Sequence, residues 1–465
     1  MPLSRSKSTD KPLFFCYLIL LVWLPLPFGA NRPMYWAPAE IAFNLLTMWW
    51  LVLWLKQRVD LSPAFIQAKW AWGCVAFFLG YIALQAAELI PGVGSVEPNH
   101  TWAQLIKSWM VFQVFALTLL LVTNHGRVKT LAWTLLLAGT FQAVYGSLMT
   151  LTGTEMIWWE IKEGYRGVAT GTFINRNHLA GYLEMSLAVG IGLMIANLNQ
   201  TEAQTWRENA RRTLDTLLGP KIRIRVCLAL MVIGLILTRS RMGNTAFFAS
   251  MMIAGLIGLL LFRKSGRGVV MLFSSLIVID IFLMGTFFGI DELQERLVES
   301  TVDEQRFEAA RMTFEMFKDH LWTGVGFGTF FAAFPLYKSE LITLYYDHAH
   351  NDFAQFAAEL GIIGLWPLVA ILGMSFYWAI RVQIERKSQL MKAMGFSSTM
   401  AMIAIGIHST TDFNLQISSN AATFMVMLAL PYVAYCVDRR EVSNPRKKSM
   451  SSSRNVEAVD KSRSS

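Results

Sequence analysis

Histidine and aspartate residues are concentrated in one short stretch of the chain, residues 345–364, which reads YYDHAHNDFAQFAAELGIIG. His348 and His350 are two of only seven histidines in the sequence, and Asp347 and Asp352 stand beside them. The stretch leads into an apolar run that is long enough to be a membrane helix. This polar cluster at the edge of an apolar segment is the first candidate site.

Local spacing predicts where that helix begins. Asp352 and Gln355 stand three residues apart just before the apolar run, which is the spacing of a capping box. His350 and Asn351 would then lie immediately outside the helix N-terminus, where amide groups and the helix dipole favour an anion such as phosphate. The same field favours a neutral imidazole at His350, which could accept a proton. The alternative is a histidine that is simply hydrogen-bonded at the membrane interface.

Four arginines near apolar segments are candidates for binding an anion. Arg239 and Arg241, in TRSRMGN, follow the apolar run LMVIGLILT, and an arginine so close to hydrocarbon must snorkel or find a partner. Arg306 and Arg311 lie on a predicted amphipathic helix. Guanidinium groups are well suited to binding diphosphate oxygens in bidentate fashion. For Arg311, an ion pair with a glutamate of the same helix is the alternative.

Two further groups of polar residues are weaker candidates, because ordinary helix capping would also explain them. They lie in GTFINRNHLAGYLEM and HSTTDFNLQ, and their members are Asn175, Arg176, Asn177, His178, His408 and Asp412. The sequence has no Walker A loop, no HExxH motif, no nucleophile elbow and no DxD pair in the predicted outer loops. We therefore expect neither ATP hydrolysis nor a catalytic metal ion or other cofactor.

The composition places these candidate residues in an integral membrane protein. Of 465 residues, 54% are hydrophobic and only 16% are charged, which is too few charges for a soluble surface of this size. Apolar stretches of about 20 residues recur along the chain without strand-like alternation, so the predicted fold is all-α. The twelve candidate spans are about residues 13–30, 37–55, 70–90, 105–123, 131–150, 178–197, 224–238, 245–262, 269–289, 352–379, 394–411 and 420–437.

The distribution of basic residues predicts the orientation. Most of the 41 lysines and arginines fall on one side if the spans alternate, and the positive-inside rule then places both termini in the cytoplasm. This explains the net charge of +9 without a nucleic-acid partner. Residues 1–437 would form one polytopic membrane domain with a retained first helix, and residues 438–465 a disordered basic tail.

Two predicted outer segments are longer than turns, residues 151–177 and 290–351. The second would be a large loop with amphipathic helices between the ninth and tenth spans. Its apolar stripe, which would face the membrane or the bundle, consists of Phe307, Ala310, Phe314 and Phe317.

The four cysteines are scattered singly, without a CxxC spacing. Cys16, Cys74, Cys227 and Cys436 each lie in or beside an apolar segment. We expect them to pack in the bundle or against lipid, rather than to bind a metal or form a redox pair.

These elements together resemble the bacterial superfamily of O-antigen ligases and surface-polysaccharide polymerases. Its ligase signature is His, then Asn, Ser or Gln, then nine residues and Gly-x-x-Gly/Thr/Tyr. His350-Asn351, residues 352–360 and the pair Gly361 and Gly364 match it completely. The two glycines also allow a close helix approach, which is the role we expect for them.

Two other segments resemble elements of the same superfamily. Ser240-Arg241 matches its Ser-Arg element, and Arg306 stands eighteen residues before the first glycine of a Gly-x-Gly-x-Gly turn, which selects Arg306 over Arg311. The chain departs from the pattern at Ala310, where many members have Trp, and at Leu321-Trp322, where many have Pro. These departures bear on where the local helix ends.

The resemblance covers about residues 165–435 and implies a twelve-span, metal-independent glycosyltransferase at the outer face of the cytoplasmic membrane. The donor would be a glycan on undecaprenyl diphosphate and the acceptor a glycan or lipid A-core, with membrane lipids and other polysaccharide-assembly proteins as further partners. Arg241 and Arg306 would bind the diphosphate, and His350 would orient or deprotonate the acceptor hydroxyl. The other predicted substrate-binding residues are Arg239, Arg311, Asn351, Asn177 and His348.

Several functions remain open at this point. The histidine signature is associated with ligases, whereas residues 171–183 and 408–424 look more like polymerases of exopolysaccharide or other surface glycans, so we favour polymerisation slightly. Glycan transfer to a protein is a third possibility. A transporter of lipid-linked solutes would instead need broken or charged helices at the bilayer midplane and a repeat between halves. A noncatalytic scaffold would leave the arginines and His350 unexplained.

Overall fold

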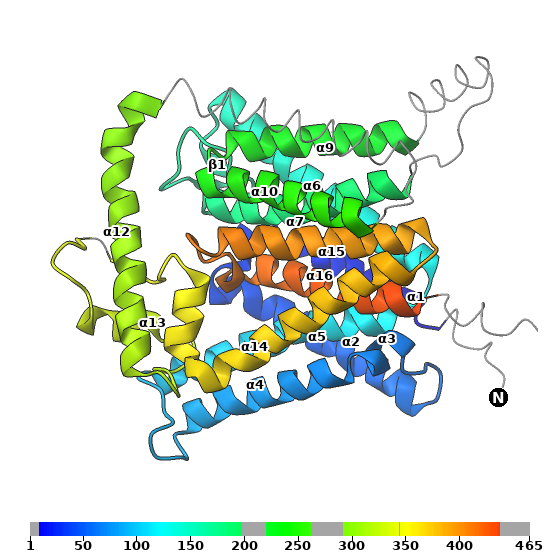
Figure 1. The fold of residues 1–465 in the computed structure, drawn as a ribbon, viewed down its shortest axis with the longest axis horizontal. Coiled ribbons are helices and arrows are strands. Elements are labelled where there is room, and N and C mark those ends of the chain that lie inside the picture. Colours follow the sequence, from blue (N-terminus) through cyan, green and yellow to red (C-terminus); the bar gives the residue numbers. More distant parts are fainter. Residues whose placement is uncertain (1–8, 198–219, 262–291, 344, 438–465) are drawn as a thin grey trace, which may run out of the picture.

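The computed structural model describes residues 9–197, 220–261, 292–343 and 345–437. Long helices run side by side, and α12 (Glu292–Asp319) crosses one end of them (Figure 1). The long helices are α1 (Lys11–Trp23), α2 (Pro33–Leu55), α4 (Lys69–Ala87), α5 (Pro98–Leu121), α6 (His125–Thr152), α7 (Arg176–Ala196), α9 (Pro220–Leu237), α10 (Arg241–Leu261), α14 (Asp352–Glu385), α15 (Gln389–His408) and α16 (Ser418–Cys436). The short elements are α3 (Pro63–Gln67), α13 (Phe330–Ala333), the 3-10 turns η1 (Phe28–Ala30), η2 (Phe334–Leu336) and η3 (Asn414–Gln416), and a hairpin of β1 (Met156–Ile157) and β2 (Glu160–Ile161).

The predicted all-α membrane fold is confirmed as a class. Among the described residues, nine helices are long and apolar enough to cross a membrane. Every predicted span except 269–289 coincides with a helix, and that span lies outside the described residues. Because α1 has only 13 residues and α9 begins with basic residues, the number of twelve spans stays a prediction. The tail 438–465 also lies outside the described residues.

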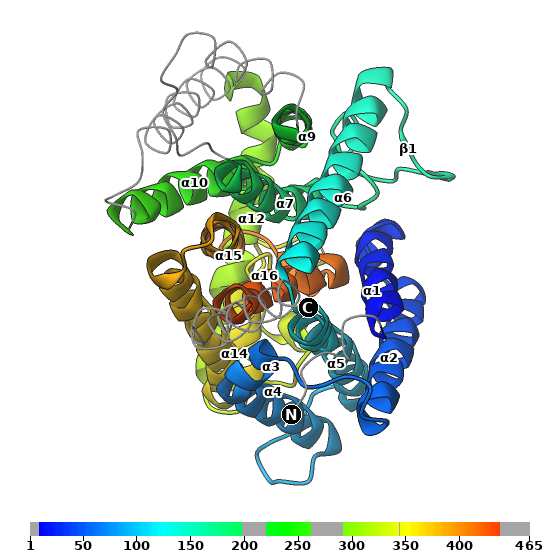
Figure 2. The same ribbon diagram turned by 90° about the vertical axis from the view of Figure 1, so that its right-hand side faces the viewer.

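Three helices form the centre of the bundle. In Figure 2, α7, α15 and α16 lie in the middle, between α10 on one side and α1 and α2 on the other. In the most apolar part of α7, 89% of residues are buried, against 28% in α2. Close packing at the centre depends on small residues: a side chain at Gly192 of α7 would come within 2.0 Å of the Ser397 hydroxyl of α15. All four cysteines are buried or partly buried, in keeping with the packing role expected for them.

A break in α14 at Gly361 positions the loop that follows α12. Gly361 has φ +60° and ψ −176°, so the amides of the next turn lose their helical partners. Ile362 N instead donates to the Leu321 carbonyl at 2.9 Å, and Ile363 N to the Trp322 carbonyl at 3.1 Å. The departure from the family pattern at 321–322 thus lies just after α12, and its two carbonyls replace those of the broken helix.

The carbonyl groups just before the break accept hydrogen bonds from the glycine-rich turn, residues 324–328. Val325 N donates to the Ala358 carbonyl at 3.0 Å, and Gly326 N donates to the Glu359 carbonyl at 3.1 Å. The turn needs Gly324, because its φ is +68° and a Cβ there would lie 2.2 Å from the Glu359 carbonyl oxygen.

Helix α4 also forms hydrogen bonds with the junction, by which we mean the break in α14 together with the glycine-rich turn. Gln85 donates to the carbonyls of Thr323 (2.7 Å) and Glu359 (3.1 Å) and accepts from Phe327 N (3.2 Å). The Tyr81 hydroxyl donates to the Thr323 carbonyl at 2.7 Å. Gly364 allows this approach, since a Cβ there would lie 2.6 Å from the Tyr81 ring. The close approach expected at both glycines is confirmed, since a Cβ at Gly361 would lie 2.4 Å from the Trp322 backbone; Gly361 is also needed for its left-handed backbone.

Only part of the predicted apolar stripe of α12 belongs to the face that packs. Ala309, Thr313 and Met316 are fully buried, whereas Phe307 is 75% exposed and Phe314 is 49% exposed. Small residues at positions 309 and 313 let the helix lie close to the bundle. Of the predicted stripe, Phe317 is partly buried and packs against the core under α12, whereas the exposed Phe307 and Phe314 fit the other predicted orientation, toward the membrane.

The segments predicted to lie on one side of the membrane meet at the end of the bundle that α12 crosses. Val96 N donates to the Val325 carbonyl at 2.9 Å, which ties the α4–α5 connection to the loop after α12. At the opposite end, Arg127 at the start of α6 forms a buried ion pair with Asp10 before α1 at 2.7 Å. These contacts place the α4–α5 connection beside the loop after α12, and the start of α6 beside the segment before α1; the alternation of spans across a membrane stays a prediction.

We predict that Gly324→Ala weakens the junction. The left-handed backbone and the clash with the Glu359 carbonyl should together cost about 2 kcal/mol or more of unfolding free energy. Gly373→Ala on α14 is the control, because nothing lies within 4 Å of a Cβ there, and alanine favours the helix by up to about 1 kcal/mol. Thermal unfolding in detergent should show a lower midpoint for the first variant only. Equal midpoints would contradict the proposed role of the turn.

Candidate active site

The N-terminus of α14 is capped by Asn351, one residue before the predicted cap. Its side-chain oxygen accepts from Ala354 N at 2.9 Å and its amide donates to the Thr410 carbonyl at 2.9 Å. Asp352, the predicted cap, is the first helical residue, and Gln355 accepts from Ala349 N at 3.0 Å. The capping-box prediction was wrong because Asn351 and Asp352 are both good caps, and only the tertiary contact to Thr410 distinguishes them.

Protein groups already occupy this helix N-terminus. Asp352 N donates to the carbonyls of Ser409 (3.0 Å) and Asp412 (3.2 Å). The Asp352 carboxylate accepts from the Ser409 hydroxyl at 2.8 Å and from Leu415 N at 3.1 Å. An anionic substrate here would therefore need cationic side chains, since the amides expected to bind it have partners.

His350 lies just outside the helix, against a buried carboxylate. Its Nδ1 is 3.6 Å from Oδ1 of Asp412, and its side chain is 13% exposed. The ring stands edge-on to Tyr346 and Phe413, with centroids 5.5 and 4.9 Å away. With φ +49°, His350 adopts a backbone conformation that is unusual for a non-glycine residue and that marks a constrained position.

Asp412 joins two histidines. The same carboxylate oxygen lies 3.8 Å from Nε2 of His178 at the start of α7, and it accepts from Phe413 N at 2.8 Å. Burial alone would raise the pKa of Asp412, but the contact with His350 and the neighbouring His178 imidazole hold it well below its usual range. Asp412 is thus a fixed negative charge that can hold Nδ1–H of His350 and leave Nε2 to accept a proton.

Arg306 reaches this group from α12 through two tyrosines. Its charge lies close enough to Tyr165 to oppose the rise in pKa that burial causes there. Burial raises the pKa of Tyr346, and Arg306 is close enough to oppose that effect. The guanidinium of Arg176 lies 5.9 Å from the Tyr165 ring centroid. The guanidinium groups of Arg306 and Arg176 therefore lie near Tyr165. Arg306 is also close to Tyr346, whose ring contacts His350.

His348 packs beside His350, in contact with Gln355 and Phe413. Its Nδ1 is within hydrogen-bond distance of Gln355, 3.1 Å from Nε2 and 3.3 Å from Oε1, and its ring stacks on Phe413 at 4.3 Å. Burial lowers its pKa to about 4 although Asp347 acts in the opposite direction. His348 is thus neutral near pH 7 and packs against Phe413; its role in binding substrate stays a prediction.

The remaining predicted residues are less closely joined to His350. Arg311 is exposed and forms a bidentate pair with Glu308 at 2.8 Å, the alternative considered for it. Asn177 is buried at the start of α7, beside His178. Arg239 and Arg241 are exposed at the start of α10, at the same end of the bundle as the loop before α7: Ala169 N donates to the Leu237 carbonyl.

Several residues of the site were missed or underrated from the sequence. His178 and Asp412 were weak candidates and prove central, while His408 forms a fully buried pair with Glu184 of α7 at 2.7 Å. No sequence pattern distinguished three further residues from other aromatic residues of the outer segments, namely Tyr165, Tyr346 and Phe413. Tyr346 is a close neighbour of His350 in the sequence, whereas Tyr165 and Phe413 are distant and are brought to the site by the packing of α7 against α15.

A bundle of apolar helices with histidine, aspartate and arginine gathered at one end defines a multi-pass membrane protein with a buried polar site. A family model described as O-antigen ligase (Wzy_C) matches residues 226–369, which include Arg241, Arg306 and His350. This match confirms the resemblance to the O-antigen ligase and polymerase superfamily that the motifs predicted. None of the curated proteins compared with the chain matches it.

The lowered pKa of His348 predicts how stability depends on pH. Between about pH 6.5, where an exposed histidine titrates, and pH 4, the folded protein binds fewer protons at this site than the unfolded chain. Stability should therefore fall as the pH is lowered through this window, by up to about 1.4 kcal/mol per pH unit. His348→Gln should make the fall less steep.

The exposed His320, at the end of α12, offers the matched control. Unfolding midpoints of the wild type, His348→Gln and His320→Gln are compared at pH 7, 6 and 5. If His348→Gln leaves the slope of the wild type unchanged, the neutral buried state of His348 is refuted.

Proposed function

We propose that the protein is a glycosyltransferase that moves a glycan from undecaprenyl diphosphate to an acceptor hydroxyl. The observation that carries the proposal is the contact between His350 and the buried Asp412 carboxylate, beside Arg306. A base held by a carboxylate next to a guanidinium group suits a reaction in which a hydroxyl attacks and a diphosphate leaves.

In the proposed reaction the acceptor oxygen attacks the anomeric carbon of the donor sugar. The new C–O bond forms as the bond from that carbon to the diphosphate oxygen breaks, and the electron pair leaves with undecaprenyl diphosphate. His350 takes the hydroxyl proton on Nε2, and Asp412 stabilises the imidazolium that forms. The 3.6 Å contact would tighten once this charge develops.

The arginines would neutralise the leaving group. Diphosphate is already a good leaving group, so positioning and charge stabilisation are the main tasks left to the protein. Arg306, held beside Tyr165 and Tyr346, would bind one phosphate, and Arg241 at the start of α10 would bind the diphosphate from the other side. This division follows the superfamily resemblance and requires no metal ion.

The site would face the periplasm, with both termini in the cytoplasm and the protein in the inner membrane. The distribution of basic residues supports this orientation, and the end carrying Trp158, Trp159 and α12 would lie at the outer interface. Within the superfamily we place polymerisation of exopolysaccharide or another surface glycan first. Ligation of O-antigen to lipid A-core is the second candidate, favoured by the complete His-Asn-x9-Gly-x-x-Gly motif.

We predict that His350→Ala, Asp412→Asn and Arg306→Ala each lower glycan transfer about 100-fold or more. Lys318→Ala is the control: Lys318 is an exposed cation of the same helix as Arg306 and pairs only with Glu315 in the described contacts. Transfer is measured with purified protein and lipid-linked oligosaccharide, and glycan length in cells is read on gels. Full-length glycan made by the three site variants at normal expression would show that the assigned site is wrong.

The product that accumulates in a deletion strain separates the two activities. Loss of a polymerase should leave single repeat units attached to the final acceptor. Loss of a ligase should leave finished polymer on undecaprenyl diphosphate. Mass analysis of the lipid-linked pool and of the acceptor fraction distinguishes these outcomes, and an unchanged glycan in both fractions would contradict the proposed function.

A further inference from the structure

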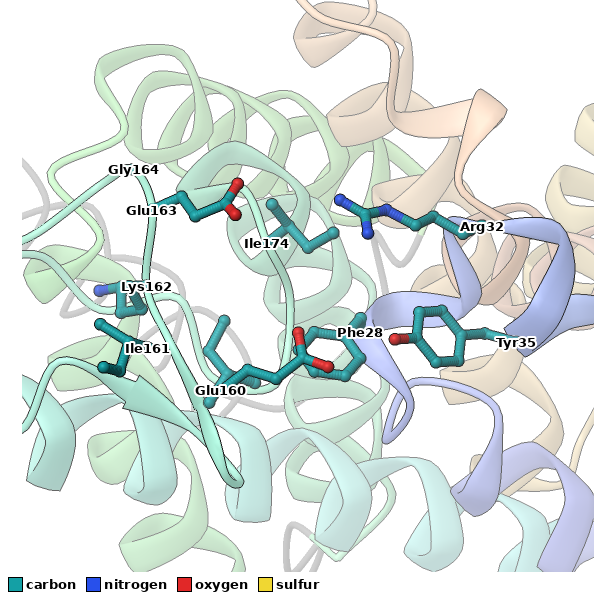
Figure 3. A pocket seen from close by; sticks show the side chains of 10 residues that line it. Phe28, Arg32, Tyr35, Glu160, Ile161, Lys162, Glu163, Gly164 and Ile174 are labelled. Carbon is teal, nitrogen blue, oxygen red and sulfur yellow. The ribbon is translucent and has the colours of Figure 1, made fainter.

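A second concave site lies between the start of α2 and the β1–β2 hairpin. Its empty space is about 530 Å³ when the open solvent at its mouth is included. The Ser419 hydroxyl donates to the carbonyl of Gly29, next to the lining residue Phe28, at 2.8 Å, which ties this pocket to the segment that follows Asp412. Figure 3 shows the side chains of Arg32, Tyr35, Glu160 and Glu163 converging on its interior, with Phe28 behind them. No part of the mechanism above uses these residues.

The lining suits a sugar. The rings of Phe28 and Tyr35 stack at 5.0 Å and 29° and form an apolar wall, against which the C–H face of a pyranose can pack. Exposed Glu160 and Glu163 offer carboxylate oxygens that accept hydrogen bonds from hydroxyl groups, and Arg32 offers donors. An apolar wall with a few convergent polar groups is the usual composition of a specific small-ligand site.

The loop that lines the pocket is firmly held. Lys162 is 1% exposed, pairs with Glu155 at 3.2 Å and donates to the Val168 carbonyl at 3.0 Å. Gly164 lines the pocket, and the next residue, Tyr165, is close to Arg306 and Asp412. One ordered loop therefore joins the pocket to a residue near the Arg306 and Asp412 side chains.

Charge decides which substrate the pocket would take. The lining carries two carboxylates, Glu160 and Glu163, and two cations, Arg32 and Lys162, so it has no net charge to attract a diphosphate. The guanidinium groups of Arg306 and Arg176 instead lie near Tyr165, and Arg241 begins α10, which lies across the central helices from α1 and α2 (Figure 2). The pocket therefore suits an uncharged sugar, and the donor diphosphate would bind the arginines.

We propose that this pocket is the acceptor subsite, binding the sugar residue whose hydroxyl is delivered to His350. The inference rests on the proposed glycosyl transfer and adds where the acceptor binds. Trp159 and Ile161 on the hairpin are 77% and 67% exposed, as expected for side chains at a lipid interface. The pocket would thus lie at the level where a membrane-bound glycan presents its sugars.

Binding is tested without turnover. The probe is the free oligosaccharide repeat unit, released by mild acid from the host's own lipid-linked pool, and saturation-transfer NMR reports its contact with full-length protein in nanodiscs. The double variant Tyr35→Ala/Glu163→Gln should bind it about 10-fold or more weakly, the loss expected when a packing surface and a hydrogen bond are removed. Glu340→Gln, an exposed carboxylate outside the pocket, should bind it like the wild type.

Steady-state kinetics then show whether the pocket binds the acceptor or the donor. For the double variant we expect the KM for the acceptor glycan to rise about 10-fold, with the KM for the lipid-linked donor unchanged. A rise confined to the donor KM, or wild-type binding and kinetics, would overturn the acceptor assignment. The His350→Ala variant should bind the repeat unit normally yet fail to transfer the glycan. If the wild-type protein binds the repeat unit but never transfers a glycan, the proposed function is refuted. The pocket would then remain a saccharide-binding site.

Discussion

The break in α14 is the constraint on which the rest of the site depends. Within a bilayer an unsatisfied backbone amide costs several kcal/mol, so the amides freed at Gly361 require acceptors from elsewhere in the chain. Leu321 and Trp322 supply them, and the glycine-rich turn returns two hydrogen bonds to the helix. This exchange fixes the end of α12, and through it Arg306, against the helix that follows His350.

A second requirement is to keep charged groups inside an apolar bundle. Buried carboxylates are tolerated when hydrogen bonds and opposite charges surround them. Asp352 receives bonds from Ser409 and Leu415, and Asp412 lies between His178 and His350. Because these partners come from α7, α14 and the segment after α15, the most buried helices also carry the chemistry.

The sequence predicted the fold class well because hydropathy alone reports membrane spans, and the motif singled out His350. It failed where two residues satisfied the same local rule, because Asn351 and Asp352 both suit a cap, and it left two orientations open for the phenylalanines of α12. The partners of His350 were harder, since Asp412 and Tyr165 lie far along the chain. Their proximity depends on how α7 packs against α15, which no local pattern encodes.

The segment between Asn351 and Gly361 has a consequence for the whole family motif. Its nine residues, Asp352 to Leu360, form an uninterrupted helix about 13 Å long that is pinned at one end by Thr410 and at the other by the glycine turn. The length of this segment sets the separation between His350, the proposed proton acceptor, and the loop that follows α12. One residue more or fewer would turn His350 by about 100° around the helix axis, so the spacing of the motif fixes a length and a phase in this chain as well as the side chains at its ends.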